Sequence, residues 1–276
     1  MTKTAFSDAT LILLGHGTTR NEDSSVPVFQ HAAELRRRGI FAAVREAFWK
    51  QAPAVGRVLA EVTTPRAFIV PIFISEGYFA HEVIPQALGF SKNRAVKTGN
   101  HTLCYTKPIG THDSMTGVLL ARAREVVKEF PQSRAPQPAE TTLFIAGHGT
   151  GRNENSRRPI ERQVELIRAR RLFADVHAVF MEETPGISEC CTLAQTRDLV
   201  VVPFFISDGL HCTEDIPVLL GEPKRLVEER LRTGQATWHN PTERHGKRVW
   251  YAKAAGTDPG VADVILERVR EVRGDR

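Results

Sequence analysis

The 276-residue sequence has no long hydrophobic run: its apolar stretches, such as residues 11–14 and 199–202, are far shorter than the roughly 20 residues of a membrane-spanning helix. The first ten residues contain no apolar core of a signal peptide. We therefore expect a cytoplasmic protein without a membrane segment. With 41% hydrophobic and 25% charged residues, the composition excludes a disordered chain and predicts an ordinary globular protein.

Cysteine is also scarce, with four residues and no C-x-x-C spacing that would indicate a zinc ribbon or a disulfide framework. We expect reduced and mostly buried thiols, with Cys212, which follows His211, as the candidate exception. Basic residues outnumber acidic ones by 37 to 32, but no Lys/Arg block marks a nucleic-acid-binding tail. The net charge of +5 suits an acidic small substrate equally well, so no nucleic-acid partner is expected.

What the sequence does contain is an internal repeat. LILLGHGTTRNEDS at 11–24 returns as LFIAGHGTGRNENS at 143–156, and PIFISEGYFAHEVIP at 71–85 returns as PFFISDGLHCTEDIP at 203–217. Both pairs lie 132 positions apart (143 − 11 and 203 − 71). A constant offset over this length indicates a duplicated unit.

The second copy is longer than the first. YTKPIGT at 105–111 matches YAKAAGT at 251–257, where the offset has grown to 146 positions (251 − 105). The second half therefore carries 14 further residues (146 − 132), which lie between Pro217 and Tyr251. We expect the segment at 221–248 to form a longer helix rather than a lid, because PKRLVEERLR has helical spacing with mixed charges.

A proline-rich segment separates the two copies. PQSRAPQPAE at 131–140 has three prolines and predicts a stiff linker between domains at 1–130 and 141–276. Apolar runs alternate with stretches of helical spacing, and in the first half these runs lie at 10–14, 41–48, 67–75 and 103–109. The alternation predicts an α/β protein with two tandem flavodoxin-like domains, each a parallel sheet covered by helices on both faces.

Polar residues at the strand ends define a candidate site, because ligands of open parallel sheets bind beyond the carboxyl ends of the strands. In the second half, the first strand runs into a Gly-His-Gly turn at His148, the second ends at Glu182, and the third leads to His211. In a flavodoxin-like strand order 2-1-3-4 these ends are neighbours. Two imidazoles and a carboxylate favour a divalent metal such as cobalt, iron, nickel or zinc. A lone histidine in such a turn is more often structural or phosphate-facing, but the convergence of three strand ends favours the metal.

The first half offers an internal comparison. The positions 132 residues before the three candidate ligands carry, in order, His16, Lys50 and Phe79. Only the histidine is a metal ligand, whereas a lysine ammonium repels a dication and attracts carboxylates. We infer that the first half has a degenerate ligand set, with metal chemistry in the second half and substrate binding in the first.

With these motifs the sequence resembles the class II chelatases of tetrapyrrole biosynthesis, which include CbiX-type sirohydrochlorin cobaltochelatases and their ferrochelatase relatives. The similarity runs through both repeats, and its most specific parts are LFIAGHGT, FMEETPG and PFFISDGLHCTEDIP. It implies a chelatase-like fold and ATP-independent insertion of a divalent metal into a macrocycle, in a cleft between two similar domains. It also implies that His148 and His211 are metal ligands and proton acceptors, with Glu182 as the carboxylate beside them.

The sequence departs from this family pattern in its first half. Many two-domain members keep the intact site there, whereas Lys50 and Phe79 replace the expected ligands here. Sirohydrochlorin-type substrates carry several carboxylates, so basic residues are expected beside the site. Arg20, Arg152 and Lys50 are the candidates, because guanidinium groups pair bidentately with carboxylates, although solvated surface positions are the plain alternative.

The predicted activity is therefore that of a sirohydrochlorin chelatase in cobalamin or siroheme biosynthesis. Its metal substrate is expected to be Co²⁺, with Fe²⁺ or Ni²⁺ as alternatives, and no organic cofactor is expected. The competing hypothesis is a non-catalytic metal- or tetrapyrrole-binding protein, because binding requires the same residues as chemistry. A histidine phosphatase is disfavoured, since such enzymes need an arginine before the histidine and Gly147 stands there. Oligomerisation stays open.

Overall fold

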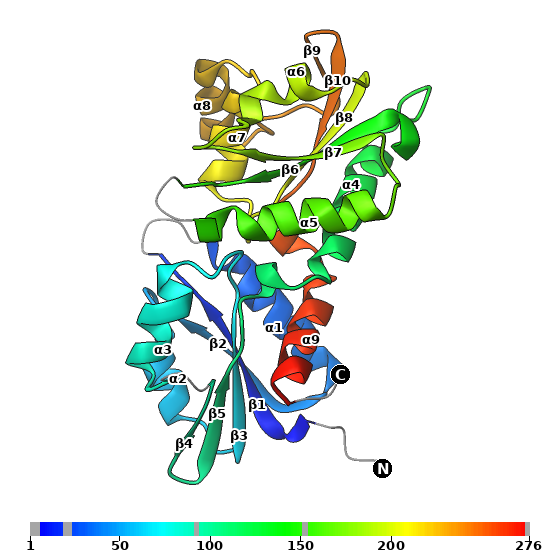
Figure 1. Ribbon diagram of the computed structural model, residues 1–276. Coiled ribbons are helices and arrows are strands. Elements are labelled where there is room, and N and C mark those ends of the chain that lie inside the picture. The colour runs from blue at the N-terminus through cyan, green and yellow to red at the C-terminus, as the bar shows by residue number, and fades with distance from the viewer. Residues whose placement is uncertain (1–5, 19–23, 91–93, 151–153, 274–276) are drawn as a thin grey trace. The chain divides into compact units, whose positions relative to one another are not determined.

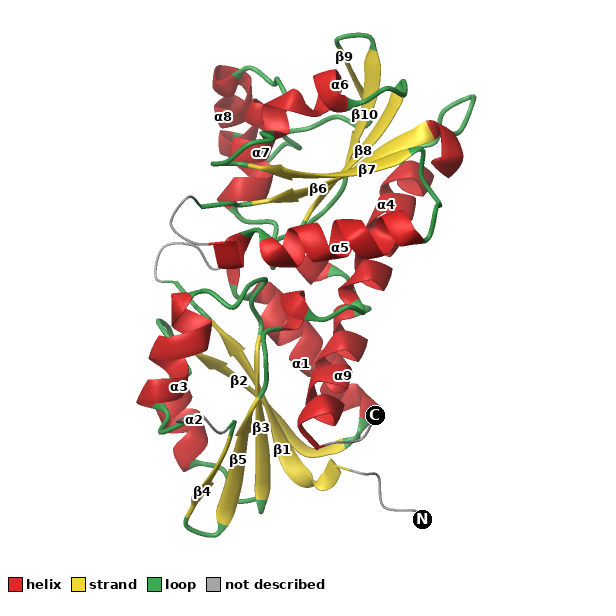
Figure 2. Cartoon of the chain, viewed as in Figure 1, coloured by secondary structure: helices red, strands yellow, loops and turns green. Residues whose placement is uncertain are grey.

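The computed structural model describes residues 6–18, 24–90, 94–150 and 154–273, which form two five-stranded sheets with helices around them (Figures 1 and 2). The strand orders are β2-β1-β3-β5-β4 and β7-β6-β8-β10-β9, so the second sheet repeats the first. The predicted duplicated α/β architecture is confirmed.

In the first half, the elements are β1 (Phe6–Gly15), α1 (Val26–Arg38), β2 (Phe41–Phe48), α2 (Val55–Ala60), β3 (Arg66–Pro71), a π-helix (Phe79–Val83), α3 (Ile84–Ala87), β4 (Ala95–Thr98), β5 (His101–Tyr105) and α4 (Met115–Glu129). In the second half, they are β6 (Thr141–Gly147), α5 (Arg158–Ala169), β7 (Asp175–Phe180), α6 (Cys190–Leu193), β8 (Asp198–Pro203), a π-helix (His211–Asp215), α7 (Ile216–Leu219), α8 (Lys224–Arg232), β9 (Thr242–Arg244), β10 (Lys247–Tyr251) and α9 (Val261–Arg273). Among the described residues, no helix combines the length and the apolar character that crossing a membrane requires.

The central strands are buried on both faces. Residues 11–14 of β1 and 143–146 of β6 are 0% exposed. In Figure 1, α1 and α9 cover one face of the first sheet and α2 and α3 the other, while α4 and α5 cover one face of the second. Covering both faces explains why these strands are continuous apolar runs in the sequence rather than alternating ones.

Each sheet ends in an antiparallel edge strand that the predicted order 2-1-3-4 lacks. β4 pairs antiparallel with β5 and β9 with β10, in both cases through a two-residue loop. The loop between β9 and β10 is His245-Gly246, and both residues have positive φ (48° and 73°). This conformation matches the right-handed twist of a hairpin. The sheets are therefore mostly parallel, with one added hairpin each.

The two compact units divide the chain differently from the sequence repeats. One unit comprises the chain up to His112 and from Pro259 onward, and the other comprises Asp113–Asp258. Helix α4, which ends the first repeat, belongs to the second unit, and α9, which ends the second repeat, belongs to the first. The division at 1–130, 131–140 and 141–276 follows the repeats, whereas the compact units exchange their last helices.

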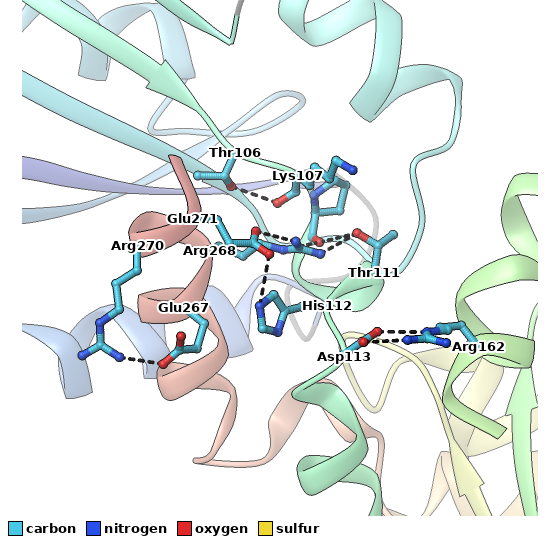
Figure 3. Close-up of polar contacts among 11 residues, drawn as sticks. Thr106, Lys107, Thr111, His112, Asp113, Arg162, Glu267, Arg268, Arg270 and Glu271 are labelled. Carbon is cyan, nitrogen blue, oxygen red and sulfur yellow. Dashed lines mark hydrogen bonds and ion pairs between the residues drawn. The ribbon is translucent and has the colours of Figure 1, made fainter. Parts of the chain in front are cut away.

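A buried arginine anchors α9 in the first unit. The Arg268 side chain is 3% exposed and donates hydrogen bonds to the Pro108 carbonyl (3.1 Å) and to Thr111 Oγ1 (2.6 Å), both near the end of β5 (Figure 3). It also pairs with Glu271 at 2.7 Å on its own helix. Burial lowers the pKa of Arg268, an effect that the hydrogen bond to Glu271 opposes.

The equivalent arginine of α4 makes the equivalent contacts in the second unit. Arg122, 146 positions before Arg268, is 4% exposed and donates to the Ala254 carbonyl (3.3 Å) and to Thr257 Oγ1 (2.7 Å). Each arginine therefore binds the loop that follows the fourth parallel strand of the other repeat. Exchange of the last helices is thus fixed by specific polar contacts as well as by apolar packing.

The additional residues of the second half form α8 and the segment leading to β9. Val227 of α8 is fully buried, and Trp238 packs on Tyr251 with ring centroids 6.1 Å apart. Glu222, 6% exposed, pairs with Arg230 at 3.0 Å and with Arg244. The expected helix covers Lys224–Arg232 and packs against the core of its unit, whereas the rest of the segment at 221–248 is connecting chain, β9 and the start of β10.

We predict that Arg268→Ala lowers the free energy of unfolding by about 2–4 kcal/mol, because it leaves buried hydrogen-bond acceptors without a donor. The matched control is Arg270→Ala on the same helix, where the arginine is 48% exposed and pairs with Glu267 at the surface. That change should cost less than about 0.5 kcal/mol. Urea denaturation of both variants measures the difference, and equal midpoints would contradict the anchoring role.

Candidate active site

Backbone pairing around β6 brings three side chains to one edge of the second sheet. Gly147 pairs with Phe180 of β7, and the pairing continues beyond the strands, where the Glu182 amide donates to the His148 carbonyl at 3.1 Å. On the other side, β6 pairs with β8, whose exit leads through a loop to the π-helix that begins at His211. The three residues therefore follow three adjacent strands.

The side chains of these residues lie close together. The rings of His148 and His211 have centroids 5.0 Å apart and stand nearly perpendicular, at 83°. Glu182 Oε1 lies 3.9 Å from His148 Nε2. The exposed fractions are 42% for His148, 58% for Glu182 and 49% for His211. The structure thus brings the three predicted ligands together at a position that solvent and a substrate can reach.

The glycines beside His148 are required by close packing. A Cβ on Gly147 would lie 2.7 Å from Ile160 Cγ1, and Gly149 has a φ of +67° with Phe180 Cβ 2.9 Å from the position of its missing Cβ. Side chains at these positions would be excluded by sterics, and at Gly149 also by backbone conformation. The Gly-His-Gly sequence therefore lets the chain turn sharply and holds the imidazole at the sheet edge.

Hydrogen bonding determines which nitrogen of His148 is available. Its Nδ1 lies 2.7 Å from the Gly149 carbonyl oxygen, which only accepts hydrogen bonds. In the neutral imidazole the proton therefore sits on Nδ1, and Nε2, the atom nearest Glu182, carries the free lone pair. His148 is thus set up to offer Nε2 as a ligand or base.

The second histidine has a carboxylate partner that the sequence analysis missed. His211 Nδ1 lies 2.6 Å from Asp215 Oδ2, four residues along the π-helix. A signal for Asp215 is present in the repeat, because the equivalent position in the first half is Val83 and the equivalent of His211 is Phe79. The first half therefore lacks both the histidine and the carboxylate of this pair.

The neighbouring carboxylate, Glu183, has a different environment. Its side chain is 11% exposed and pairs with Arg157 at 2.9 Å, and the Arg157 guanidinium lies 4.5 Å from the centroid of the Phe180 ring. Glu183 thus holds the loop after β7, whereas Glu182 faces His148. Cys212, next to His211, is 4% exposed, and burial raises the pKa of its thiol. Cys212 is therefore no exception to the expected buried thiols.

The three candidate ligands do not form a closed coordination sphere. Within the described residues, no three His, Cys, Asp or Glu side chains lie close enough to hold a metal ion together. The two imidazoles are adjacent, and the Glu182 carboxylate lies 3.9 Å from His148 Nε2.

The first unit has the same geometry with different chemistry. His16 Nδ1 lies 2.9 Å from the Gly17 carbonyl, and the Phe79 ring stands at 85° to the His16 ring with centroids 5.5 Å apart. The Lys50 amide donates to the His16 carbonyl at 2.9 Å, and its ammonium lies 5.4 Å from the centroid of the Phe79 ring. Tyr78 beside Phe79 is 63% exposed. An aromatic ring and a cation thus occupy the places of an imidazole and a carboxylate.

The predicted substrate-binding residues are placed unequally. Lys50 is exposed at the edge of the first sheet, in the position equivalent to Glu182. Arg20 and Arg152 lie outside the described residues. Their part in binding stays a prediction.

Comparison with known proteins places these features in a family. The CbiX family model matches the chain twice, over residues 10–126 and 142–272. A protein of Halobacterium salinarum named probable sirohydrochlorin cobaltochelatase is 38% identical over 279 residues, covering 95% of this chain and 90% of that protein.

Solved structures share the fold. DR2241 of Deinococcus radiodurans, a multi-domain protein with structural similarity to chelatases, superposes with a TM-score of 0.78 and 28% identity over 97% of this chain and 56% of that chain. The chain therefore spans little more than half the length of DR2241. SirB from Bacillus subtilis with Fe³⁺ has a TM-score of 0.68 at 15% identity, covering 96% of this chain and 95% of SirB. The predicted chelatase-like fold is confirmed, and with the family model matched in both halves the chain belongs to the CbiX family.

Proposed function

We propose that the protein inserts a divalent metal ion, without ATP, into sirohydrochlorin or a related tetrapyrrole. The observation that carries this proposal is the perpendicular pair of imidazoles, His148 and His211, with Glu182 3.9 Å from His148 Nε2. The names of relatives in the CbiX family support the same reaction. In this proposal His148, Glu182 and His211 are the catalytic residues and the ligands of the incoming metal.

The chemistry of metalation requires groups of this kind. Insertion exchanges two pyrrole N–H protons for one metal dication, so the site has to accept protons and to hold the metal loosely enough to release it. The lone pair of His148 Nε2 serves either purpose, because neutral imidazole is both a base and a ligand near physiological pH. Glu182, exposed and beside Nε2, can accept a proton that leaves the His148 imidazole.

Cobalt is the proposed metal substrate, since the relative from Halobacterium salinarum is named as a cobaltochelatase. Fe²⁺ and Ni²⁺ are the alternative substrates, because imidazole and carboxylate ligands suit several first-row dications. No organic cofactor takes part in the proposed reaction.

The first unit supplies substrate binding in this proposal. Lys50 offers a cation to a substrate carboxylate, and the exposed rings of Tyr78 and Phe79 beside it offer apolar surface to a conjugated macrocycle. Arg20 and Arg152, which follow the two Gly-His-Gly turns, are proposed as further carboxylate ligands. The equivalent positions of the first unit carry one histidine and no carboxylate, so no metal site is proposed there.

We predict that the purified protein accelerates Co²⁺ insertion into sirohydrochlorin, measured by the change in tetrapyrrole absorbance against a protein-free blank. His148→Ala and His211→Ala should each lower kcat by about 100-fold or more, because each removes a ligand and a base. His16→Ala, at the equivalent position of the first half, should keep activity within about threefold. Tetrapyrrole or metal binding without faster metalation would show a carrier rather than an enzyme, and loss of activity only in His16→Ala would move the site to the first half.

We further predict that Lys50→Ala raises the KM for sirohydrochlorin about fivefold at low salt and leaves kcat nearly unchanged, as expected for loss of one exposed ion pair of about 1 kcal/mol. The effect should shrink as the salt concentration rises. Lys97→Ala, at an exposed position of β4, is the control for loss of a surface charge. Identical KM values for the two variants would exclude Lys50 from substrate binding.

A further inference from the structure

We propose that Asp215 is a positioning residue that fixes the tautomer and the ring orientation of His211, so that His211 Nε2 faces the incoming metal. This inference rests on the proposed function, because it assigns Asp215 to the same site. Asp215 contacts His211 and is proposed to act on the metal only through that histidine.

The contact itself is short and directional. His211 Nδ1 lies 2.6 Å from Asp215 Oδ2, with the two residues four positions apart on one face of the π-helix. An ionised carboxylate only accepts hydrogen bonds, so the proton of the neutral imidazole sits on Nδ1 and the lone pair on Nε2. The remaining described ring neighbours of His211 are the rings of His148 and Phe205, with centroids 5.0 Å and 5.9 Å away.

The two histidines reach the same tautomer by different means. The Gly149 carbonyl accepts from His148 Nδ1, and this contact comes with the Gly-His-Gly turn itself. His211 lies on a helix, where backbone carbonyls are engaged in the helix, so a side chain has to supply the acceptor. Without Asp215, nothing among the described contacts of His211 would favour one tautomer over the other.

Comparison with the first half distinguishes positioning of His211 from a role of Asp215 in stabilising the π-helix. There the π-helix Phe79–Val83 forms with valine at the position of Asp215, so the carboxylate is not needed for the helix. Asp215 is the residue before α7, yet its side chain makes no capping hydrogen bond to that helix. The histidine of the Gly-His-Gly turn persists as His16, whereas the His–Asp pair is replaced as a unit by Phe79 and Val83. The carboxylate is therefore present where the helix carries a histidine.

The expected consequence is tighter and better-oriented metal binding. A carboxylate that accepts from the distal nitrogen of a histidine restricts rotation of the ring and strengthens the other nitrogen as a ligand, and loss of such a partner typically costs 10- to 100-fold in metal affinity. In a site that already lacks a closed set of ligands, orientation of each imidazole decides whether both reach the same ion.

The test replaces Asp215 in the full-length protein by the residue of the first half, Asp215→Val, and by its neutral isostere, Asp215→Asn. We expect Asp215→Val to weaken Co²⁺ binding about 10- to 100-fold, measured by the visible absorption of bound Co²⁺. Asp215→Asn should lie between this variant and the wild type, because its amide oxygen still accepts from Nδ1. The KM for Co²⁺ should rise, whereas the KM for sirohydrochlorin should stay unchanged.

The ¹⁵N chemical shifts of His211 report the tautomer directly and do not depend on turnover. They should show the Nδ1–H form in the wild type and a mixture in Asp215→Val, with an unchanged thermal midpoint. Glu214→Gln, at the adjacent residue, removes the same charge without touching His211 and should keep Co²⁺ affinity within about twofold of the wild type. Wild-type affinity and a single Nδ1–H tautomer in Asp215→Val would overturn the proposal.

A reciprocal experiment transfers the pair to the first half. In a His211→Ala background, Phe79→His with Lys50→Glu should create weak Co²⁺ binding at His16, and adding Val83→Asp should tighten it at least tenfold, whereas Val83→Asn should tighten it less. Equal affinity with and without Val83→Asp would contradict the proposal. If no variant metalates sirohydrochlorin while the tautomer and affinity results hold, the proposed reaction fails and the role of Asp215 stands.

Discussion

Parallel pairing of β6 with β7 on one side and with β8 on the other is the constraint on which the candidate site depends. The register that sets Gly147 against Phe180 and Ala146 against Pro203 ends all three strands at one level. The residues that directly follow β6 and β7 then lie beside one another, as the hydrogen bond from the Glu182 amide to the His148 carbonyl shows. A shift of one residue in either pairing would turn the side chains to the opposite face of the sheet.

The same pairing exists in the first unit, so the backbone alone does not make a metal site. There the edge carries a histidine, a phenylalanine and a lysine in nearly the same arrangement, with perpendicular rings in both units. The duplicated fold thus holds two matched positions, and two substitutions, Lys50 for Glu182 and Phe79 for His211, separate an edge with candidate metal ligands from one with an aromatic ring and a cation. This division supports a protein in which one half handles the metal and the other holds the substrate.

Much of this arrangement was predictable from the sequence because the repeat identifies equivalent residues without a structure. The strand ends at His148, Glu182 and His211 followed from apolar runs and their neighbours, and the structure brings these residues together. Exchange of α4 and α9 was not predictable, since the two helices have similar apolar faces and either repeat's sheet would bury them. Asp215 was missed because its importance depends on a side-chain contact, although its replacement by Val83 was visible.

The most direct test of the account is the position of Co²⁺ in crystals of the full-length protein, located by anomalous X-ray scattering. The account predicts a single strong peak within bonding distance of His148 Nε2 and His211 Nε2, with Glu182 turned toward it, and no peak at His16. A peak at His16, or one that involves Lys50 and Phe79 rather than the two histidines, would contradict the assignment of metal chemistry to the second half.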